Sequence, residues 1–327
     1  MATLADAHSP RPRAGRWVRY LRGDVVIAYL LLVACLVAGR FSSPYFLTGR
    51  NIADLLAQAA TLGMVGIGET LVILIGGIDL SVGSLISLTT TVASYVIVSD
   101  ATGNMLVGTA LCLVIGAASG LINGLGIAFL RIPDFMMTLA MMAALQGAAL
   151  FLRPAPDGLI SNTFSNALTA QIGPLPVLAL VVLFVAIATQ VLLRVTPFGL
   201  HLYAIGSYRE SARLAGIGIK RVRIGAYVLC GIAAALAGLL FSARIGTGDP
   251  LSGQPFALTA VTAVVIGGSS LFGGRGSAAM TIAGALILTC VGNVLTLMQV
   301  SSYYQYVITG VLLIAAVWLY SYLPIRR

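Results

Sequence analysis

Four polar side chains interrupt long apolar stretches of this sequence: Glu69, Asp79, Asn123 and Gln146. A polar group surrounded by hydrocarbon is costly, so each needs a hydrogen-bonding partner or a water-filled cavity. Carboxylates and amides in such positions either contact a polar substrate or tie neighbouring helices together. These four residues are therefore the candidates for chemistry within the apolar part of the chain.

The two carboxyl groups each support two interpretations. Asp79 is followed by Leu80, Ser81 and an apolar run, so it could cap or brace the start of the next helix, or line a translocation pathway. Glu69 has no cation near it within its own apolar run. It must be neutral, exposed to water or paired across helices, and both a functional and a bracing role remain open.

Asn123 stands beside three glycines spaced four residues apart, Gly116, Gly120 and Gly124. This spacing places the glycines on one helix face, where they let another helix backbone approach closely. The pattern predicts that Asn123 forms a hydrogen-bonded tie between helices rather than a substrate ligand.

Residues for catalysis or metal binding are scarce. The only histidines are His8 and His201, and neither GxSxG nor GxxxxGK[ST] occurs. The cysteines lie in apolar runs without CxxC spacing, at positions 35, 112, 230 and 290. We expect no catalytic residue, no metal site and no cofactor bound by this chain, so active transport would draw on an ion gradient or another subunit.

A short polar segment, residues 206–217, has the features of a capped helix. Ser207 is a suitable N-cap with Glu210 three residues later, which is a capping box, and Gly216 is a natural stop. Arg213 shares a face with Glu210 and could pair with it. A helix of about two turns is marginal alone in water, so it should dock on a partner protein.

The elements that position these residues must be membrane helices. The sequence is 59% hydrophobic and 9% charged, with a mean hydropathy of +1.00, whereas soluble domains carry about 25% charged residues. The apolar runs show no dyad alternation, which favours helices. About ten runs reach spanning length: 25–41, 52–75, 82–99, 104–130, 134–152, 174–195, 223–243, 257–272, 277–298 and 303–323. The sequence predicts an all-α, polytopic transmembrane helix bundle with about ten spans.

Basic residues predict the orientation. The formal charge is +9, and the basic clusters lie before the first span, within 196–223 and at the C-terminus. The positive-inside rule makes these parts and both termini cytoplasmic, and leaves residues near 153–173 and 244–256 outside. The charges flank spans, so no nucleic-acid partner is expected. Further spans follow the first, which is therefore interpreted as an uncleaved helix rather than a signal peptide.

No soluble domain can be separated from the rest. We expect a cytoplasmic arm (1–23), one transmembrane domain (24–323) with a cytoplasmic loop at 196–223, and a cytoplasmic tail (324–327).

One short motif occurs twice in the chain, each time between two apolar runs. Residues 75–83 and 266–274 both read IGGxxLxxG. Glycine-interrupted segments at matching positions point towards the pathway of a transporter, although a chain with 37 glycines could also produce the repeat by chance. An alternation of ten spans places both copies on the same side, so the repeat is not assigned as inverted.

The segment 206–217 resembles the cytoplasmic coupling loop of sugar-type permeases of bacterial ABC importers, the family typified by ribose permeases. It departs from the family pattern at Ser207, Tyr208 and Ser211. The matching positions are Gly206, Glu210, Ala212, Arg213, Gly216 and Ile217. Similar motifs occur at 76–83, 121–124, 131–135 and 267–274, so the likeness runs from about residue 50 to 320.

The resemblance implies an inner-membrane permease for ribose or a related monosaccharide. It implies a homodimer or pseudo-dimer of permeases, a cytoplasmic ATPase that holds ATP and Mg²⁺, and a periplasmic sugar-binding protein. It assigns ATPase coupling to Ser207, Arg209, Glu210, Ala212, Arg213 and Gly216. It also adds Phe135 to the pathway candidates, which are otherwise the four residues that interrupt the apolar runs.

Other transport functions stay open. A branched-chain amino-acid or nucleoside permease of the same superfamily would share the motifs. An ion-coupled secondary transporter is disfavoured by the capped cytoplasmic helix and by the scarcity of carboxylates within spans. The sequence does not identify the sugar.

Overall fold

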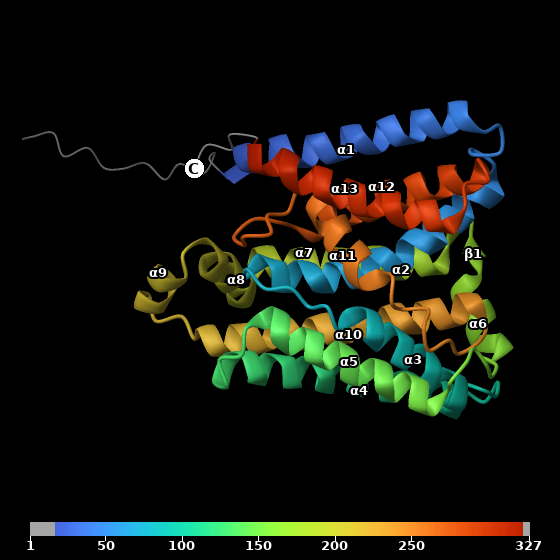
Figure 1. Cartoon of the computed structure of the whole chain (residues 1–327), viewed down its shortest axis with the longest axis horizontal. Coiled ribbons are helices and arrows are strands. Elements are labelled where there is room, and N and C mark those ends of the chain that lie inside the picture. Colours follow the sequence, from blue (N-terminus) through green and yellow to red (C-terminus); the bar gives the residue numbers. More distant parts are fainter. Residues whose placement is uncertain (1–16, 323–327) are drawn as a thin grey trace, which may run out of the picture.

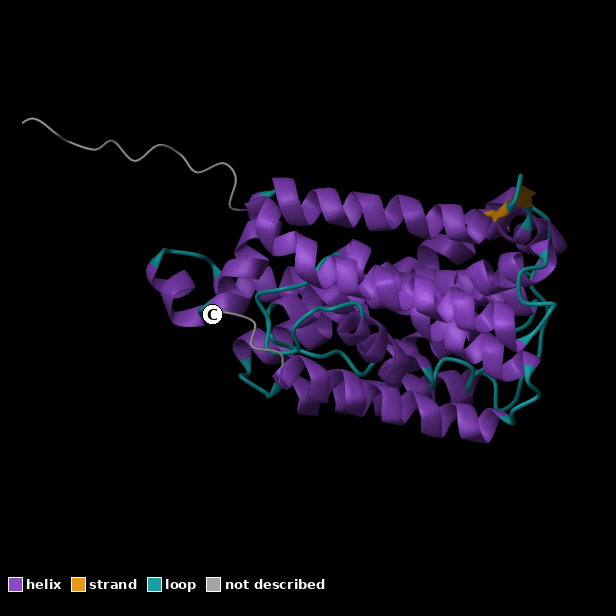
Figure 2. Cartoon of the chain, turned by 90° about the horizontal axis from the view of Figure 1, so that it is seen from above, coloured by secondary structure: helices purple, strands orange, loops and turns teal. Residues whose placement is uncertain are grey.

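The computed structural model describes residues 17–322, which form an elongated bundle of roughly aligned helices (Figures 1 and 2). The helices are α1 (Trp17–Ser42), α2 (Gly49–Leu74), α3 (Val82–Val96), α4 (Thr102–Phe129), α5 (Asp134–Leu152), α6 (Asn162–Thr169), α7 (Val177–Val195), α8 (Pro197–Ser207), α9 (Arg209–Leu214), α10 (Ile219–Ile245), α11 (Phe256–Ile266), α12 (Ala278–Leu297) and α13 (Ser302–Tyr322). The strands are β1 (Gln171–Ile172) and β2 (Leu175–Pro176), paired antiparallel. The all-α prediction is confirmed for this part of the chain.

Among residues 17–322, six helices are long and apolar enough to cross a membrane: α2, α4, α5, α7, α10 and α12. Shorter apolar helices make up most of the remaining predicted runs, among them α3 and α11. A non-helical segment after Ile266 interrupts the predicted run 257–272 and shortens α11, whereas α3 ends at Val96, three residues before the end of its predicted run. The expected tail (324–327) and most of the expected arm (1–23) lie outside the described residues, and α1 already begins at Trp17.

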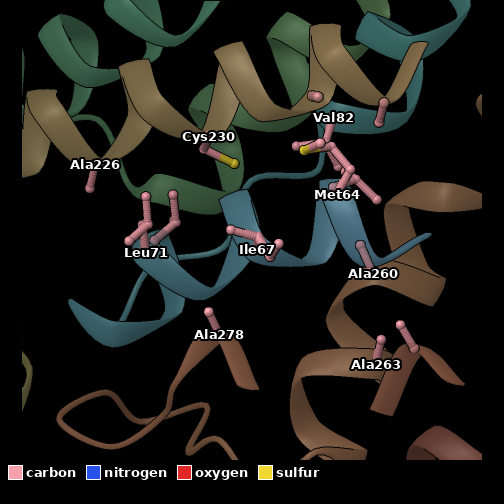
Figure 3. Close-up of a cluster of buried hydrophobic side chains, with 14 of the residues drawn as sticks. Met64, Ile67, Leu71, Val82, Ala226, Cys230, Ala260, Ala263 and Ala278 are labelled. Atoms are coloured by element: carbon pink, nitrogen blue, oxygen red, sulfur yellow. The ribbon is translucent and has the colours of Figure 1, made fainter. Parts of the chain in front are cut away.

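The core is built around α2 and α10. In its most apolar window, 83% of α2 is buried, against 11% for α5, so α2 lies inside the bundle and α5 on its surface. Ile67 and Leu71 of α2 face Ala226 and Cys230 of α10, with alanines of α11 and α12 on the other side (Figure 3). The small residues of α10, α11 and α12 that surround Ile67 and Leu71 allow the backbones to approach closely.

The predicted glycine face of α4 packs on α10. A Cβ atom at Gly116 or Gly120 would overlap backbone atoms of α10, and one at Gly124 would lie 2.8 Å from the Cα of Ile224. The prediction that these glycines permit close helix approach is therefore confirmed.

Two non-helical segments interrupt the bundle between consecutive helices. Residues 75–81 connect α2 to α3, and residues 267–277 connect α11 to α12. Gly76 and Gly273 adopt φ values of +77° and +87°, which non-glycine residues rarely adopt. We call residues 75–81 the first break and residues 267–277 the second break. The two IGGxxLxxG copies fall at these breaks.

The two ends of the bundle carry different connections. The helices α8 and α9 lie at one end, with the start of α1 and the end of α13, and α6 and β1 lie at the other (Figure 1). A bridge between Asp157 and Gly248 joins the segments 153–173 and 244–256. The two segments expected outside are therefore close together, at the opposite end from the loop expected inside.

Candidate functional site

The first break places a carboxyl pair in the centre of the bundle. Glu69 and Asp79 are 0% and 1% exposed. The backbone N–H of Asp79 donates to Oε1 of Glu69 over 3.0 Å. Backbone N–H groups in the non-helical segment between α2 and α3 have no intrahelical acceptor, so buried ones need another partner. Glu69 supplies an acceptor for one of them.

Asp79 holds the chain just before α3. Its Oδ1 accepts from the backbone N–H of Ser81 over 2.9 Å and from the Ser81 hydroxyl over 2.5 Å. This is a local side-chain-to-backbone turn. The cap residue of α3 is Ser81, which makes no side-chain cap bond. Asp79 therefore braces the break, one of its two predicted roles, instead of occupying the N-cap position.

Asn123 links α4 to the same cluster. Its Nδ2 donates to the Ser81 hydroxyl over 3.0 Å and lies 3.4 Å from both carboxylate oxygens of Asp79. On the other side, the Cys230 thiol of α10 lies 3.8 Å from Glu69 Oε2. The predicted interhelical tie is confirmed, and Glu69 is paired across helices. Three of the five pathway candidates meet here.

A second polar group lies next to the break and was missed by sequence reasoning. Tyr227 of α10 donates to Asp134 Oδ2 over 3.1 Å, and Arg223 pairs with Asp134 Oδ1 at 3.6 Å. Thr138 donates to the carbonyl of Ile78 in the break. Arg223 and Tyr227 are four residues apart and therefore lie on one face of α10. This spacing was overlooked because Arg223 was assigned to the cytoplasmic loop 196–223.

The other two pathway candidates lie elsewhere. Gln146 donates to the Pro250 carbonyl over 2.7 Å and accepts from Ser84 over 3.4 Å, so it joins α5 to the segment before α11. Phe135 is 57% exposed on α5. Neither belongs to the central cluster.

The central cluster is built to hold the break in place. Glu69 accepts from the break, Asp79 accepts from Ser81 within it, and Asn123 donates to Ser81 from α4, while Oδ1 of Asn123 is buried without a hydrogen-bond partner among the described residues. Within residues 17–322 no set of three or more His, Cys, Asp or Glu side chains could hold a metal ion. The described cysteines are all free.

The capping-box prediction for 206–217 is wrong. Ser207 is the last residue of α8, and Tyr208 caps α9 without a side-chain bond. Because α8 continues through Ser207, this side chain cannot start the next helix. Glu210 instead pairs with Arg213, whose Nη2 lies 2.5 Å from Oε1, and both side chains are exposed. The guanidinium of Arg213 lowers the pKa of Glu210, and the carboxylate raises the pKa of Arg213.

The predicted end of this helix is confirmed. Gly216 has φ of +78°, and its N–H donates to Arg213 while that of Ile217 donates to Ala212, a glycine-dependent helix stop. Ala212 is buried at 4% exposure, whereas Tyr208, the residue before α9, and Leu214, its last residue, are 74% and 76% exposed.

The helix α9 projects from the end of the bundle (Figure 1). A six-residue helix that presents an aromatic, an aliphatic and three charged side chains is suited to contact another protein, because so short a helix gains little stability by itself. Sequence reasoning had found the charged residues of this surface but missed Tyr208 and Leu214.

A family model described as "Branched-chain amino acid transport system / permease component" matches residues 51–317. The match includes both breaks and the α8–α9 segment. The chain belongs to this permease family. It is accordingly a multi-pass inner-membrane protein, as its apolar helices also indicate.

Several curated relatives of this permease are similar over most of its length. It is 37% identical over 300 residues to the ribose import permease protein RbsC of Escherichia coli K12, covering 89% of this chain and 91% of the relative. It is 33% identical to the D-allose transport system permease protein AlsC of the same strain, covering 88% and 89%. It is 34% identical to the L-arabinose ABC transporter permease protein AraH of Azospirillum brasilense, covering 97% and 91%. No solved structure matches the chain significantly.

These relatives decide between the transport classes considered from the sequence. Although the family model is named for branched-chain amino acids, the three permeases above are named for sugars. The resemblance to sugar-type permeases of ABC importers is confirmed, and the amino-acid alternative is not favoured. The permease is a transport subunit of that type.

Proposed function

We propose that this permease carries a monosaccharide, ribose or a close relative, across the inner membrane. The observation that carries the proposal is the near full-length similarity to permeases named for ribose, allose and arabinose. Uptake of labelled ribose into cells that express the permease with its transport partners tests it. Unlabelled ribose, arabinose or allose should compete, and leucine should not. Uptake of leucine in place of these sugars would contradict the proposal.

The membrane topology we propose has ten crossings, with both termini, the arm 1–23, the loop 196–223 and the tail 324–327 in the cytoplasm. Each break with its short helix would complete one crossing, and α1 and α13 would add the first and last. Non-helical backbone at membrane depth is acceptable where protein surrounds it, as at the buried residues of the first break.

Cysteine labelling in a cysteine-free background tests this topology. Asn166 and Ser211 are both exposed, at opposite ends of the bundle. A membrane-impermeant reagent added to the periplasm should label Asn166→Cys and leave Ser211→Cys unmodified. The opposite result would reverse the orientation.

Energy is proposed to come from a separate ATPase that holds ATP and Mg²⁺ and binds α9, with this chain binding neither. The exposed Arg209, Glu210 and Arg213 would form the charged contact, and Tyr208 and Leu214 its apolar part. We assign the other predicted coupling residues to shaping this surface: Ala212 packs inward, Gly216 ends α9, and Ser207 ends α8.

The assembly is proposed to contain two permease copies, ATPase domains on the cytoplasmic side and a periplasmic sugar-binding protein. Membership of a family of importer permeases supports these partners. Co-purification of a tagged permease with an untagged copy would test the pair, and a single copy per complex would contradict it.

A further inference from the structure

Gly206, near the end of α8, lies directly against the end of α2 and against the second break. A Cβ atom at this position would overlap the carbonyl oxygen of Leu74 and the backbone nitrogen of Gly274. Leu74 is the last residue of α2, and Gly274 belongs to the second break. The backbone of α8 therefore touches both elements without an intervening side chain.

The second break is also bonded to the end of α2, directly before the first break. The N–H of Gly274 donates to the Leu74 carbonyl over 2.9 Å. A Cβ atom at Gly273 would lie 3.0 Å from the Cα of Gly206 and 3.0 Å from the nitrogen of Gly76. We call this meeting of Leu74, Gly76, Gly206, Gly273 and Gly274 the glycine junction.

A second contact joins α8 to the second break. Tyr203, one turn before Gly206, donates its hydroxyl to the Gly276 carbonyl over 2.7 Å. Only Tyr208 separates α8 from α9. The exposed helix proposed to bind the ATPase is thus one residue away from a helix held to the second break at two points.

Contacts between backbones leave little room for independent movement. Flexible side chains can change rotamer to absorb a shift, but backbone atoms in direct contact cannot, and packed interfaces tend to move as units. If α8 moves further than these backbone contacts allow, it must either carry both breaks with it or separate the glycine junction.

We propose that Gly206 is a positioning residue through which movement of α8 and α9 reaches both breaks at once. The proposal rests on the proposed function, in which an ATPase binds α9, and adds that the ATP cycle moves α9 and α8. Both breaks then change their exposure in the same step of the ATP cycle, although residues 75–81 and 267–277 are far apart in sequence.

Reporter cysteines on each break test this in the complex of permease, ATPase and binding protein, reconstituted in proteoliposomes. Phe272, 87% exposed, reports on the second break and the half-buried Leu80 on the first. The measured quantity is the labelling rate of Phe272→Cys or Leu80→Cys with and without ATP, together with ATP hydrolysis.

The chain offers a matched pair of glycine variants. Gly206→Ala places a methyl group against two backbones, whereas Gly218→Ala, in the same loop, would meet only the Arg221 side chain at 3.9 Å. With native glycines or Gly218→Ala, ATP should change both labelling rates several-fold. With Gly206→Ala the change should fall below about two-fold at both reporters while basal ATP hydrolysis persists. An undiminished change at either reporter in Gly206→Ala would overturn the proposal.

If Gly206→Ala does not reach the membrane, Tyr203→Phe replaces it in the same experiment. Tyr203→Phe removes only the hydrogen bond to the Gly276 carbonyl and keeps the aromatic ring. It should at least halve the ATP-dependent change at Phe272→Cys at normal membrane yield, and an unchanged response would overturn the proposal. ATP-driven sugar uptake without any ATP-dependent labelling in the unmodified complex would also overturn it. Absence of ATP-driven sugar uptake in the unmodified complex would instead contradict the proposed function.

Discussion

Replacing Glu69 by glutamine should leave the permease folded, whereas replacing it by alanine should destabilise it. Glutamine keeps an oxygen in place of Oε1, which accepts the backbone N–H of Asp79 in the first break. Alanine removes this acceptor and leaves a buried donor unsatisfied. The comparison therefore separates the acceptor oxygen from the charge of the carboxyl group.

The size of the destabilisation by Glu69→Ala follows from two effects, the lost acceptor and the cavity left by the side chain. An orphaned buried N–H costs about 1–3 kcal/mol. A void of roughly 50 Å³, at about 24 cal/mol per Å³, adds about 1 kcal/mol. Glu69→Ala should thus lower the free energy of unfolding by about 2–4 kcal/mol, and Glu69→Gln by less than about 1 kcal/mol.

Reversible unfolding of the purified permease in mixed micelles, titrated with a denaturing detergent, measures this difference. Thr61→Val is a matched control on the same helix, because the Thr61 hydroxyl is buried without a hydrogen-bond partner among the described residues. It should be close to neutral. Equal destabilisation by glutamine and alanine at position 69 would refute the reasoning, because the charge rather than the acceptor would then matter.

Three further predictions follow from the described contacts. Asp79→Asn keeps an acceptor for the turn before α3, so it should preserve assembly and uptake, and Asp79→Ala should reduce both; loss of uptake in Asp79→Asn at normal expression would instead indicate a role for the charge. Gly120→Ala pushes a methyl group into the α10 backbone, whereas Gly103→Ala meets nothing within 4 Å, so detergent unfolding should detect destabilisation only in the former. Glu210→Ala and Arg213→Ala alter an exposed pair, so membrane insertion should stay normal while ATP hydrolysis is uncoupled from uptake; unchanged coupling in the double variant would remove the pair from the ATPase contact.

The fold class was predictable because composition and apolar run length report directly on a membrane environment. The glycine face of α4 was predictable for a similar reason, since Gly116, Gly120 and Gly124 recur with the helical period on one element. Both inferences use local information only.

The central cluster was predictable residue by residue but not as a cluster. Glu69, Asp79 and Asn123 stood out as polar residues in apolar runs. Their meeting depends on how α4 packs beside the first break, which is a tertiary arrangement. Tyr227 gave little signal because an aromatic residue is ordinary in an apolar run.

The error at Ser207 has a local cause. Serine followed three residues later by glutamate is typical of a helix start, but here α8 extends through that position. Packing of α8 on the breaks overrides the local preference. Gly206 carried a family resemblance in the sequence, but its contacts with Leu74 and Gly274 join segments far apart in the chain and could not be deduced from spacing.

ATP-driven uptake tests the central claim most directly. The permease, its ATPase and the binding protein are reconstituted in proteoliposomes, with ATP supplied on the side that exposes α9 and labelled ribose on the other. The account predicts that ribose accumulates only while ATP is hydrolysed and continues to accumulate when a protonophore abolishes the proton gradient. Accumulation that follows the proton gradient and ignores ATP would contradict it.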